Sequence, residues 1–498
     1  MTVQRIPLAG SIVNRNSNPE SFINEGQRFT NCYPEVTQNP VTGQSSLALY
    51  KRLGYTGTNN APASYAGLGG AFVWSGGNRA VFPYLNGTTL AVYDSNLAIV
   101  GATITNVSGW PLITETTYNN KATLTMTLRK STDSLQHAYY FSEGDVSWTE
   151  ITDTDYPVNQ GTPLTTVGRI VHLDGFAFII DTKGQIWNSN LNDITTWTAT
   201  GFITAQSSPD SGAGLAVTKN IVVAFGSGSI EFFQNAGNAT GSPLTRIASA
   251  AINIGSTTVG TGFNPSHIEI GDSVYFFGTG SDSGQTGVYR LTGTSLQKIS
   301  NPAIDKLILE NVSSDVYGWA GTFKSHGMTH LLMYTGGTGN APCYCLETGV
   351  WWYFTCGDTN TIRSCVDLGT KSYLTGGTRK LYTMDSGSPV FTDDGSTMTM
   401  SIQTQNIDHG TRNRKFYKSA EIIGDIRSTA GNTTISYSDD DYQSFSTARN
   451  VDMSSDPPAR PKLYRLGSGR RRAWKVEDTV DAPFRAEALE IEFDVGSL

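Results

Sequence analysis

The stretch Ile170-Val-His-Leu-Asp-Gly-Phe-Ala-Phe-Ile-Ile180 decides the fold class of this chain. Two runs of β-branched and aromatic residues flank the dipeptide Asp174-Gly175, which is typical of a tight turn between two antiparallel strands. A third short run, Gln185-Ile-Trp187, follows after another turn. The stretch therefore predicts a small antiparallel sheet.

Units of this kind recur along much of the chain. The last five of seven hairpin-like units begin at residues 170, 221, 273, 331 and 371. A repeating all-β unit of about 40 to 50 residues is the period of propeller blades. Radial repetition also protects the edges of the sheets. We predict an all-β propeller with six blades, and seven blades as the alternative. The seven hairpins span residues 71–93, 122–148, 170–187, 221–233, 273–291, 331–354 and 371–382.

The composition excludes several classes of protein. Only 16% of the 498 residues are charged, 53 are glycine, and the formal net charge is −8. A coiled coil requires many Ala, Glu, Lys and Leu, and a disordered chain carries few aromatic residues. A dedicated nucleic-acid binder is usually basic. The apolar runs are too short to span a bilayer, the first residues do not resemble a secretory signal, and five cysteines indicate reduced thiols rather than a disulfide scaffold.

The pattern changes near residue 395, where the turn cluster Asp393-Asp-Gly-Ser396 occurs. We predict three segments: an N-terminal extended arm with first strands at 1–60, the propeller at 61–395, and a separate C-terminal β-domain at 396–498. One segment has the signature of a helix, because Asn301 is a good N-cap residue and Pro302 suits the first helical position. A short helix is therefore expected over residues 301–311.

A basic run near the C-terminus is the strongest cluster of charge. It reads Arg470-Arg-Arg472-Ala-Trp474-Lys475. A basic run that contains an aromatic residue can bind phosphates. The alternative is a solvated or inter-subunit face, balanced by the nearby acids. The candidate contacts with DNA or with another subunit are Arg470, Arg471, Arg472 and Lys475.

The segment Ser438-Asp-Asp-Asp-Tyr-Gln-Ser-Phe445 resembles an Asp-box hairpin, Ser-x-Asp-x-Gly-x-Thr-Trp. Tyr442 replaces the Gly and Phe445 replaces the Trp. The Asp side chain is expected to accept backbone N–H groups within the turn, and the aromatic residue is expected to anchor the hairpin. Three consecutive aspartates do not predict a calcium site, because neighbouring side chains on a strand point to opposite faces.

Other clusters do not support metal or nucleophilic chemistry. Two histidines and four cysteines lie within 40 residues, but their spacing matches no zinc motif. The sequence predicts no catalytic set, metal or cofactor, and we expect that the protein is not an enzyme. This cluster consists of His326, His330, Cys343, Cys345, Cys356 and Cys365.

Several short motifs together resemble one family, the tail nozzle proteins of short-tailed bacteriophages, also called tail hub or packaged-DNA stabilization proteins. The resemblance begins with an Asn-x-Tyr-Pro motif and a Leu-Gly turn, and it continues through the middle and the C-terminal part of the chain. It is carried by residues 29–34, 47–54, 287–291, 298–305, 438–440, 461–467, 469–474 and 490–492.

The resemblance implies a structural protein of the virion tail, made in the cytoplasm of the bacterial host. It implies six subunits, each with a six-bladed propeller, in a closed ring around the DNA exit channel below the portal and adaptor rings. Such a ring retains packaged DNA, lets double-stranded DNA pass without sequence-specific binding, and anchors fibres or spikes. A mildly acidic chain suits this role, because phosphate contacts dominate affinity for DNA. No membrane partner is expected.

Two alternatives remain open at this stage. A carbohydrate-binding or glycan-cleaving propeller would use Trp351 and Trp352, with acids such as Asp174, Asp181 and Glu231 as a catalytic pair. A trimeric tail fibre is the weaker alternative, because the chain lacks a repetitive shaft sequence.

Overall fold

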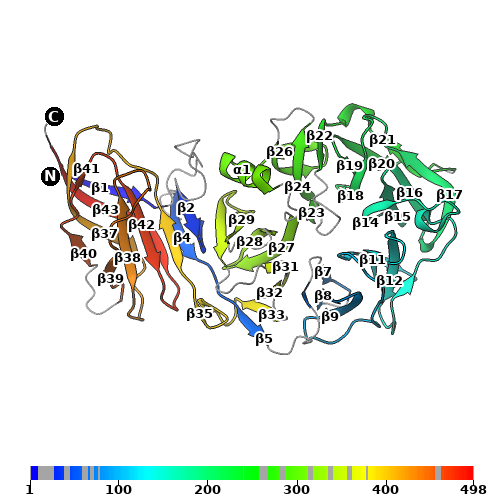
Figure 1. Ribbon diagram of the computed structural model, residues 1–498, viewed down its shortest axis with the longest axis horizontal. Coiled ribbons are helices and arrows are strands. Elements are labelled where there is room, and N and C mark those ends of the chain that lie inside the picture. Colours follow the sequence, from blue (N-terminus) through cyan, green and yellow to red (C-terminus); the bar gives the residue numbers. More distant parts are fainter. Residues whose placement is uncertain are drawn as a thin grey trace.

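The computed structural model describes residues 2–8, 27–38, 45–58, 66–67, 72–76, 79–238, 240–256, 267–280, 286–311, 318–334, 340–355, 362–376, 380–454 and 461–496. A ring of small sheets occupies one end of an elongated molecule, and a β-sandwich that contains both termini occupies the other (Figure 1). Among the described residues, no helix has the length and hydropathy that a bilayer span requires.

Five units of the ring are separate antiparallel sheets. Each unit uses the local hairpins that the alternating sequence predicts. The first contains β6 (Ala66–Gly67), β7 (Phe72–Trp74), β8 (Arg79–Asn86) and β9 (Thr89–Asp94). The second contains β10 (Leu112–Tyr118), β11 (Lys121–Arg129), β12 (Gln136–Ser142) and β13 (Thr149–Glu150). The third contains β14 (Thr166–Leu173), β15 (Phe176–Asp181), β16 (Gln185–Asn190) and β17 (Asp193–Thr204).

The fourth unit contains β18 (Gly212–Thr218), β19 (Ile221–Gly226), β20 (Ile230–Asn235) and β21 (Leu244–Arg246). The fifth contains β22 (Ile254–Ser256), β23 (His267–Ile270), β24 (Ser273–Gly280), β25 (Gly287–Thr292) and β26 (Ser295–Lys298).

Two further four-stranded units belong to a larger sheet. One contains β27 (Gly318–Ser325), β28 (Met328–Tyr334), β29 (Asn340–Cys345) and β30 (Trp351–Thr355). The other contains β31 (Ile362–Leu368), β32 (Lys371–Gly376) and β33 (Leu381–Asp385), and it is completed by β5 (Thr56–Thr58) from the N-terminal part of the chain. A strand from far away in the sequence thus closes the last unit.

The favoured count of six blades is wrong. Successive units pack against one another in chain order, and the β31–β33 unit packs against the first unit, which closes the ring. The described part of the chain therefore holds seven such units, five as separate sheets and two within the larger one. The propeller fold itself is confirmed. Each of the seven predicted hairpins lies in a unit of its own.

The sandwich combines strands from both ends of the chain. Its first sheet contains β1 (Thr2–Pro7), β3 (Cys32–Gln38), β4 (Ser45–Lys51), β37 (Lys415–Gly424), β40 (Lys462–Tyr464), β41 (Ser468–Gly469) and β43 (Arg485–Val495). Its second sheet contains β2 (Arg28–Thr30), β36 (Met400–Gln403), β38 (Thr433–Ser438), β39 (Arg449–Val451) and β42 (Ala473–Asp478). The predicted C-terminal β-domain is therefore built together with strands of the segment 1–60.

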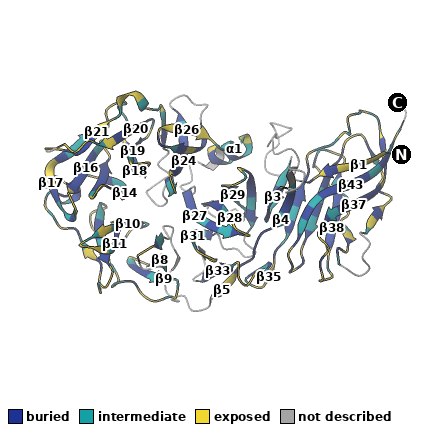
Figure 2. Cartoon of the chain, turned by 180° about the vertical axis from the view of Figure 1, so that it is seen from behind, coloured by how far each residue is buried: buried dark blue, intermediate teal, exposed yellow. Residues whose placement is uncertain are grey.

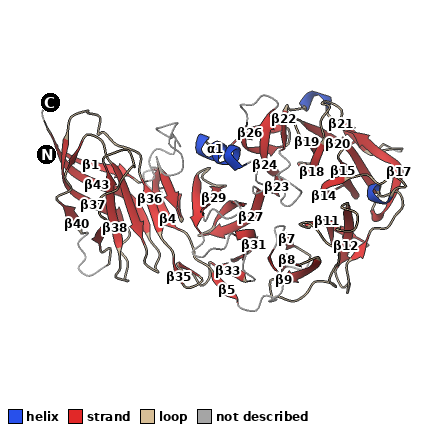
Figure 3. Cartoon of the chain, viewed as in Figure 1, coloured by secondary structure: helices blue, strands red, loops and turns tan. Residues whose placement is uncertain are grey.

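Helices are few among the described residues (Figure 3). The predicted helix is present as α1 (Pro302–Asn311), and the Asn301 side chain accepts the Ile304 N–H at 3.0 Å as an N-cap. Two 3-10 turns, η1 (Pro157–Asn159) and η2 (Ala248–Ala250), and a short hairpin of β34 (Thr392–Asp393) and β35 (Ser396–Thr397) complete the structure.

Apolar side chains are buried between neighbouring units of the ring and between the two sheets of the sandwich (Figure 2). Trp74, Trp319, Trp352 and Trp474 are among the largest fully buried side chains. Stacked aromatic pairs contribute to this packing. For example, the rings of Phe277 and Trp319 lie 4.6 Å apart between adjacent units.

A buried polar cluster joins the sandwich to the ring. Arg52 donates to both carboxylate oxygens of Asp393, at 2.9 and 2.6 Å, and to the Thr355 carbonyl at 2.9 Å. Its Nε donates to the Asn31 side chain at 2.8 Å, and its guanidinium lies 4.0 Å from the centre of the Phe354 ring. Each guanidinium nitrogen of Arg52 donates a hydrogen bond. The cluster therefore fixes the position of the sandwich relative to the ring.

Candidate functional site

The basic run does not form one continuous basic surface, because its members point to different surroundings. Arg472 is fully buried, whereas the Arg471 side chain is 56% exposed and pairs with Asp441. Arg470 is exposed, and its carbonyl accepts a hydrogen bond from Lys415 Nζ at 2.6 Å. Lys475 is partly exposed and pairs with Glu477 at 2.5 Å.

The buried guanidinium of Arg472 contacts several parts of the sandwich. Its guanidinium donates to both oxygens of Asp439, at 2.8 and 2.7 Å, and to the Leu466 carbonyl at 2.7 Å. It lies 4.0 and 3.7 Å from the ring centres of Tyr417 and Tyr437, which is the geometry of cation–π contacts. Arg472 therefore holds the sandwich together, and its prediction as a DNA or inter-subunit contact needs correction.

The turn at residues 438–445 contains the hydrogen bonds that its resemblance to an Asp box predicts. Asp440 accepts the Ser444 N–H at 3.0 Å and the Ser438 hydroxyl at 2.7 Å, and it also pairs with the Ser444 hydroxyl. These bonds to Ser444 and Ser438 lower the pKa of Asp440 to about 2. Tyr442 is the buried anchor, however, and Phe445 is only partly buried.

The three aspartates of this hairpin do not converge on one point. Asp439 pairs with Arg472, Asp440 holds the turn, and Asp441 accepts from Asn406 at 2.9 Å. Over the described residues, no group of three or more His, Cys, Asp or Glu side chains is arranged to hold a metal ion. Cys356, which belonged to the suspected zinc cluster, lies outside the described residues.

The residues that a glycan-active propeller would use have other roles. Trp351 and Trp352 are buried, and their indole N–H groups donate to the Ile299 carbonyl at 2.8 Å and to His330 Nδ1 at 3.2 Å. They therefore cannot line an open glycan cleft. The structure contradicts this part of the alternative function.

The named acids also serve local structure. Asp181 is buried and accepts the N–H groups of Lys183 and Gln185 at 2.8 and 2.9 Å. Glu231 is buried and accepts the Ser207 N–H at 2.7 Å. Asp174, the third acid, accepts from Asn235 on the surface of the ring. Each of the three carboxylates is therefore engaged in a structural hydrogen bond.

Side chains of the innermost strands approach one another near the axis of the propeller. A cavity of about 160 Å³ lies between the innermost strands, and it is lined by residues that include Arg169, Glu269, Trp319 and Gly321. Burial lowers the pKa of Arg169 and raises that of Glu269. Side chains from six of the seven units therefore meet around one small cavity.

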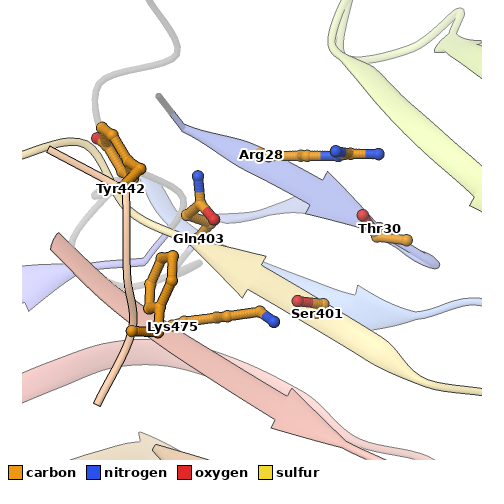
Figure 4. A pocket seen from close by; sticks show the side chains of 7 residues that line it. Arg28, Thr30, Ser401, Gln403, Tyr442 and Lys475 are labelled. Carbon is orange, nitrogen blue, oxygen red and sulfur yellow. The ribbon is translucent and has the colours of Figure 1, made fainter. Parts of the chain in front are cut away.

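A larger pocket of about 350 Å³ lies on the outer face of the second sandwich sheet (Figure 4). We call it the polar pocket. In the strand register, Arg28 lies beside Gln403, Gln403 lies beside Lys475, and Thr30 lies beside Ser401. The polar pocket is lined by Arg28, Thr30, Ser401, Gln403, Tyr442, Phe445 and Lys475.

The chemistry of the polar pocket suits an anion. Arg28 and Lys475 line it from strands that lie on either side of β36, with hydroxyl and amide groups between them. The Arg28 guanidinium lies at the edge of the pocket, 4.5 Å from the centre of the Tyr353 ring. Burial lowers the pKa of Arg28, while the neighbouring Tyr353 phenol acts in the opposite direction. The sequence pointed only to Lys475. The local signal for Arg28 and Gln403, a polar–apolar–polar alternation, does not show which strands become neighbours.

Comparisons with solved structures find matches of low sequence identity. A catalytically inactive virginiamycin B lyase from Staphylococcus aureus, solved with quinupristin, matches with 9% identity and a TM-score of 0.42, covering 67% of this chain and 98% of that one. The computationally designed Ika8 protein matches with 9% identity and a TM-score of 0.34, covering 67% and 98%. Scores this low carry no argument about function. No curated protein matches the sequence.

The comparison with family models gives a specific result. The model described as "Bacteriophage P22 Gp10, beta-propeller" matches residues 77–333, slightly more than half of the chain. The matched region begins in the first unit of the ring and ends in β28. This chain belongs to the bacteriophage P22 Gp10 beta-propeller family.

Proposed function

We propose that this structural phage protein is the nozzle or hub of a short tail, where copies form a closed ring around the DNA exit channel. The observation that carries the proposal is the family match over residues 77–333. In this role the protein is not an enzyme. It retains packaged DNA, sits in the virion tail below the portal and adaptor rings, and anchors fibres or spikes.

The narrow axis of the propeller supports a channel formed by several copies. A cavity of about 160 Å³ that is lined by strands of six units is too small for a duplex. DNA would therefore pass through a lumen between subunits. A closed ring of identical copies requires a head-to-tail contact between two different surfaces of each chain. We expect six copies.

The charge of the chain also supports passage of DNA without tight binding. The net charge is −8, and only 16% of residues are charged. Since release of counterions from phosphate contacts supplies most non-specific affinity, a surface poor in cations lets a duplex slide. Arg470, Arg471 and Lys475 remain candidates for a contact with DNA or with another subunit.

Electron microscopy of the purified chain tests this proposal, alone and mixed with portal and adaptor rings. We expect six-fold rings or tubes with a lumen wide enough for a duplex, in at least one of the two samples. Portal and adaptor rings without the chain serve as the control. Single propellers that join no ring in either sample would refute the nozzle proposal.

A further inference from the structure

The polar pocket has the features of a site for carboxylate groups. Arg28 and Lys475 are separated by the strand that carries Gln403, so their backbones lie about 10 Å apart. Glu477 already pairs with Lys475, but both side chains are partly exposed, and a pair near the surface contributes little to stability. Tyr442 and Phe445 add aromatic walls. Such a site fits two carboxylates presented together.

The opposite side of the sandwich presents such carboxylates. We call it the acidic face. Glu490 and Glu492 lie two residues apart on β43, which places them about 7 Å apart on one side of the sheet. Neither forms an ion pair within the part of the chain that the structure describes, and Glu492 accepts from the Ser419 hydroxyl at 3.1 Å. Lys462 and Lys418 pair with Glu421 and Asp494, and their charges also interact with Glu490 and Glu492. The alternate residues of β43, Leu489 and Ile491, point to the other side of the sheet and are buried in the core.

Exposed apolar side chains share the acidic face. In the strand register, Val3 and Ser419 lie beside Glu492, and Tyr464 lies beside Ser419. Val3 and Tyr464 are 60% and 59% exposed. Phe416, which pairs with Asp494 one row further along, is 51% exposed. Aromatic and apolar residues of this size among charges are typical of a protein interface rather than of a DNA-facing surface.

We propose that the polar pocket of one copy receives Glu490 and Glu492 of the next copy, and that this contact joins the subunits. The proposal rests on the ring of the proposed function, for which it names the contact. The two surfaces lie on opposite outer faces of one sandwich, so their association is head-to-tail, as a closed ring requires. Complementary charge favours this pairing and disfavours a contact between two like faces.

Charge reversal provides a strict test. The basic-reversed variant carries Arg28→Glu and Lys475→Glu, and the acid-reversed variant carries Glu490→Lys and Glu492→Lys. Each alone places like charges opposite one another, so self-association should weaken about tenfold or more. An equimolar mixture should assemble again, because the reversed pocket of one variant attracts the reversed face of the other. Assembly of the mixture would also show that both variants are folded.

Sedimentation and mass photometry of the full-length chain at low and high salt give the readout. The matched control carries Lys121→Glu and Lys183→Glu, which make the same change in charge on the exposed surface of the ring. It should assemble like the original protein. If all variants form rings equally well, the proposed contact is wrong while the nozzle proposal stands. If no variant or original chain forms rings, even with portal and adaptor, the nozzle proposal fails.

Cross-linking reads the contact directly, even where association is weak. With p-benzoylphenylalanine in place of Phe445, irradiation of the concentrated chain should yield dimers joined to residues 485–495 of a second copy. Cross-links to other segments, or none, would overturn the proposal. Binding of a short DNA duplex that the basic-reversed variant loses would also overturn it, because the pocket would then be a phosphate site.

Discussion

Two adjacent arginines in the basic run have opposite roles. Arg472 is enclosed by Asp439, Tyr417 and Tyr437, whereas Arg471 projects from the surface. Both residues precede β42: Arg471 lies in a bend, whereas Arg472 forms a bridge to Ile407 that turns its side chain into the sandwich. A run of like charges in a sequence therefore does not define a surface patch until the sheet is known.

The two arginines should respond differently to removal. Arg472→Ala leaves Asp439 without its partner and removes the cation between two tyrosines, so the free energy of unfolding should fall by about 3 kcal/mol. Arg471→Ala is the matched control, and a surface change of this kind should shift stability by less than about 0.5 kcal/mol. Urea denaturation of the two variants measures both effects. An equal loss in the two would contradict the structural role of Arg472.

Two buried histidines make stability depend on pH. His267 Nε2 donates to the Leu215 carbonyl at 2.8 Å, and His330 Nδ1 accepts from the Trp352 indole at 3.2 Å. Burial lowers the pKa of each to about 3, and nearby Arg169 adds to the effect for His267. Both are therefore neutral in the folded protein at pH values where an unfolded histidine is already protonated.

The sign of the pH effect follows from this difference. Below pH 6.5 the unfolded chain binds more protons, so stability falls as the pH is lowered from about 6.5 towards 3. Between pH 7.5 and 5.5 each of the two histidines should lower the free energy of unfolding by about 1.4 kcal/mol in total. The variant His267→Gln keeps a donor for the Leu215 carbonyl but does not titrate. It should remove about half of the pH dependence of the free energy of unfolding that His267 and His330 cause together. Denaturation between pH 7.5 and 5.5 checks this, and an unchanged slope would contradict it.

At the scale of elements, short hairpins become blades because neighbouring units approach closely. The innermost strands β27 and β31 meet at the pair Gly321 and Cys365. Gly321 has φ +132°, and a Cβ there would lie 1.9 Å from the Cys365 carbonyl oxygen. Only glycine permits this approach between two blades, since any side chain would push their backbones apart.

Alanine substitutions separate this close approach from backbone strain. Gly321→Ala should lower the free energy of unfolding by roughly 2 kcal/mol more than Gly327→Ala, because the overpacking cost adds to the cost of a positive φ. Gly327 has φ +80° but open space around it. Its substitution therefore measures only the cost of placing alanine at a positive φ. Thermal unfolding of both variants gives the difference. Equal losses would mean that the two blades shift apart freely.

At the scale of the molecule, the junction of ring and sandwich depends on residues from four segments. Asn31 adopts a positive φ of 54° and links Arg52, Thr355 and the Thr399 carbonyl through its side chain. It lies in the Asn-x-Tyr-Pro motif that first suggested a phage tail family. Its role here is to satisfy buried polar groups where the chain crosses between the two parts.

Loss of Arg52 should uncouple the two parts. Arg52→Met leaves Asp393 buried without its partner, and removal of one member of a buried pair costs about 3–5 kcal/mol. We expect calorimetry to show the sandwich and the ring unfolding in two separate transitions. Arg5→Met, which removes an exposed pair with Glu487, is the control and should leave a single transition near its original temperature. One shared transition in both variants would contradict this account of the junction.

The sequence by itself determined the features that depend on neighbours along the chain. Alternating apolar residues specified the seven hairpins, Asn301 and Pro302 specified α1, and Ser438 with Asp440 specified the turn, because hydrogen bonds within a few residues form each of them. The family resemblance also came from short local motifs.

Only the tertiary structure decided features that depend on distant segments. It paired β5 with β33 to complete a seventh unit, joined strands from both termini in one sandwich, buried Arg472, and placed Arg28 beside Lys475 across β36. The physical reason is that the partner of a strand is chosen by burial of a common core, and alternation along one strand does not reveal which strand lies next to it.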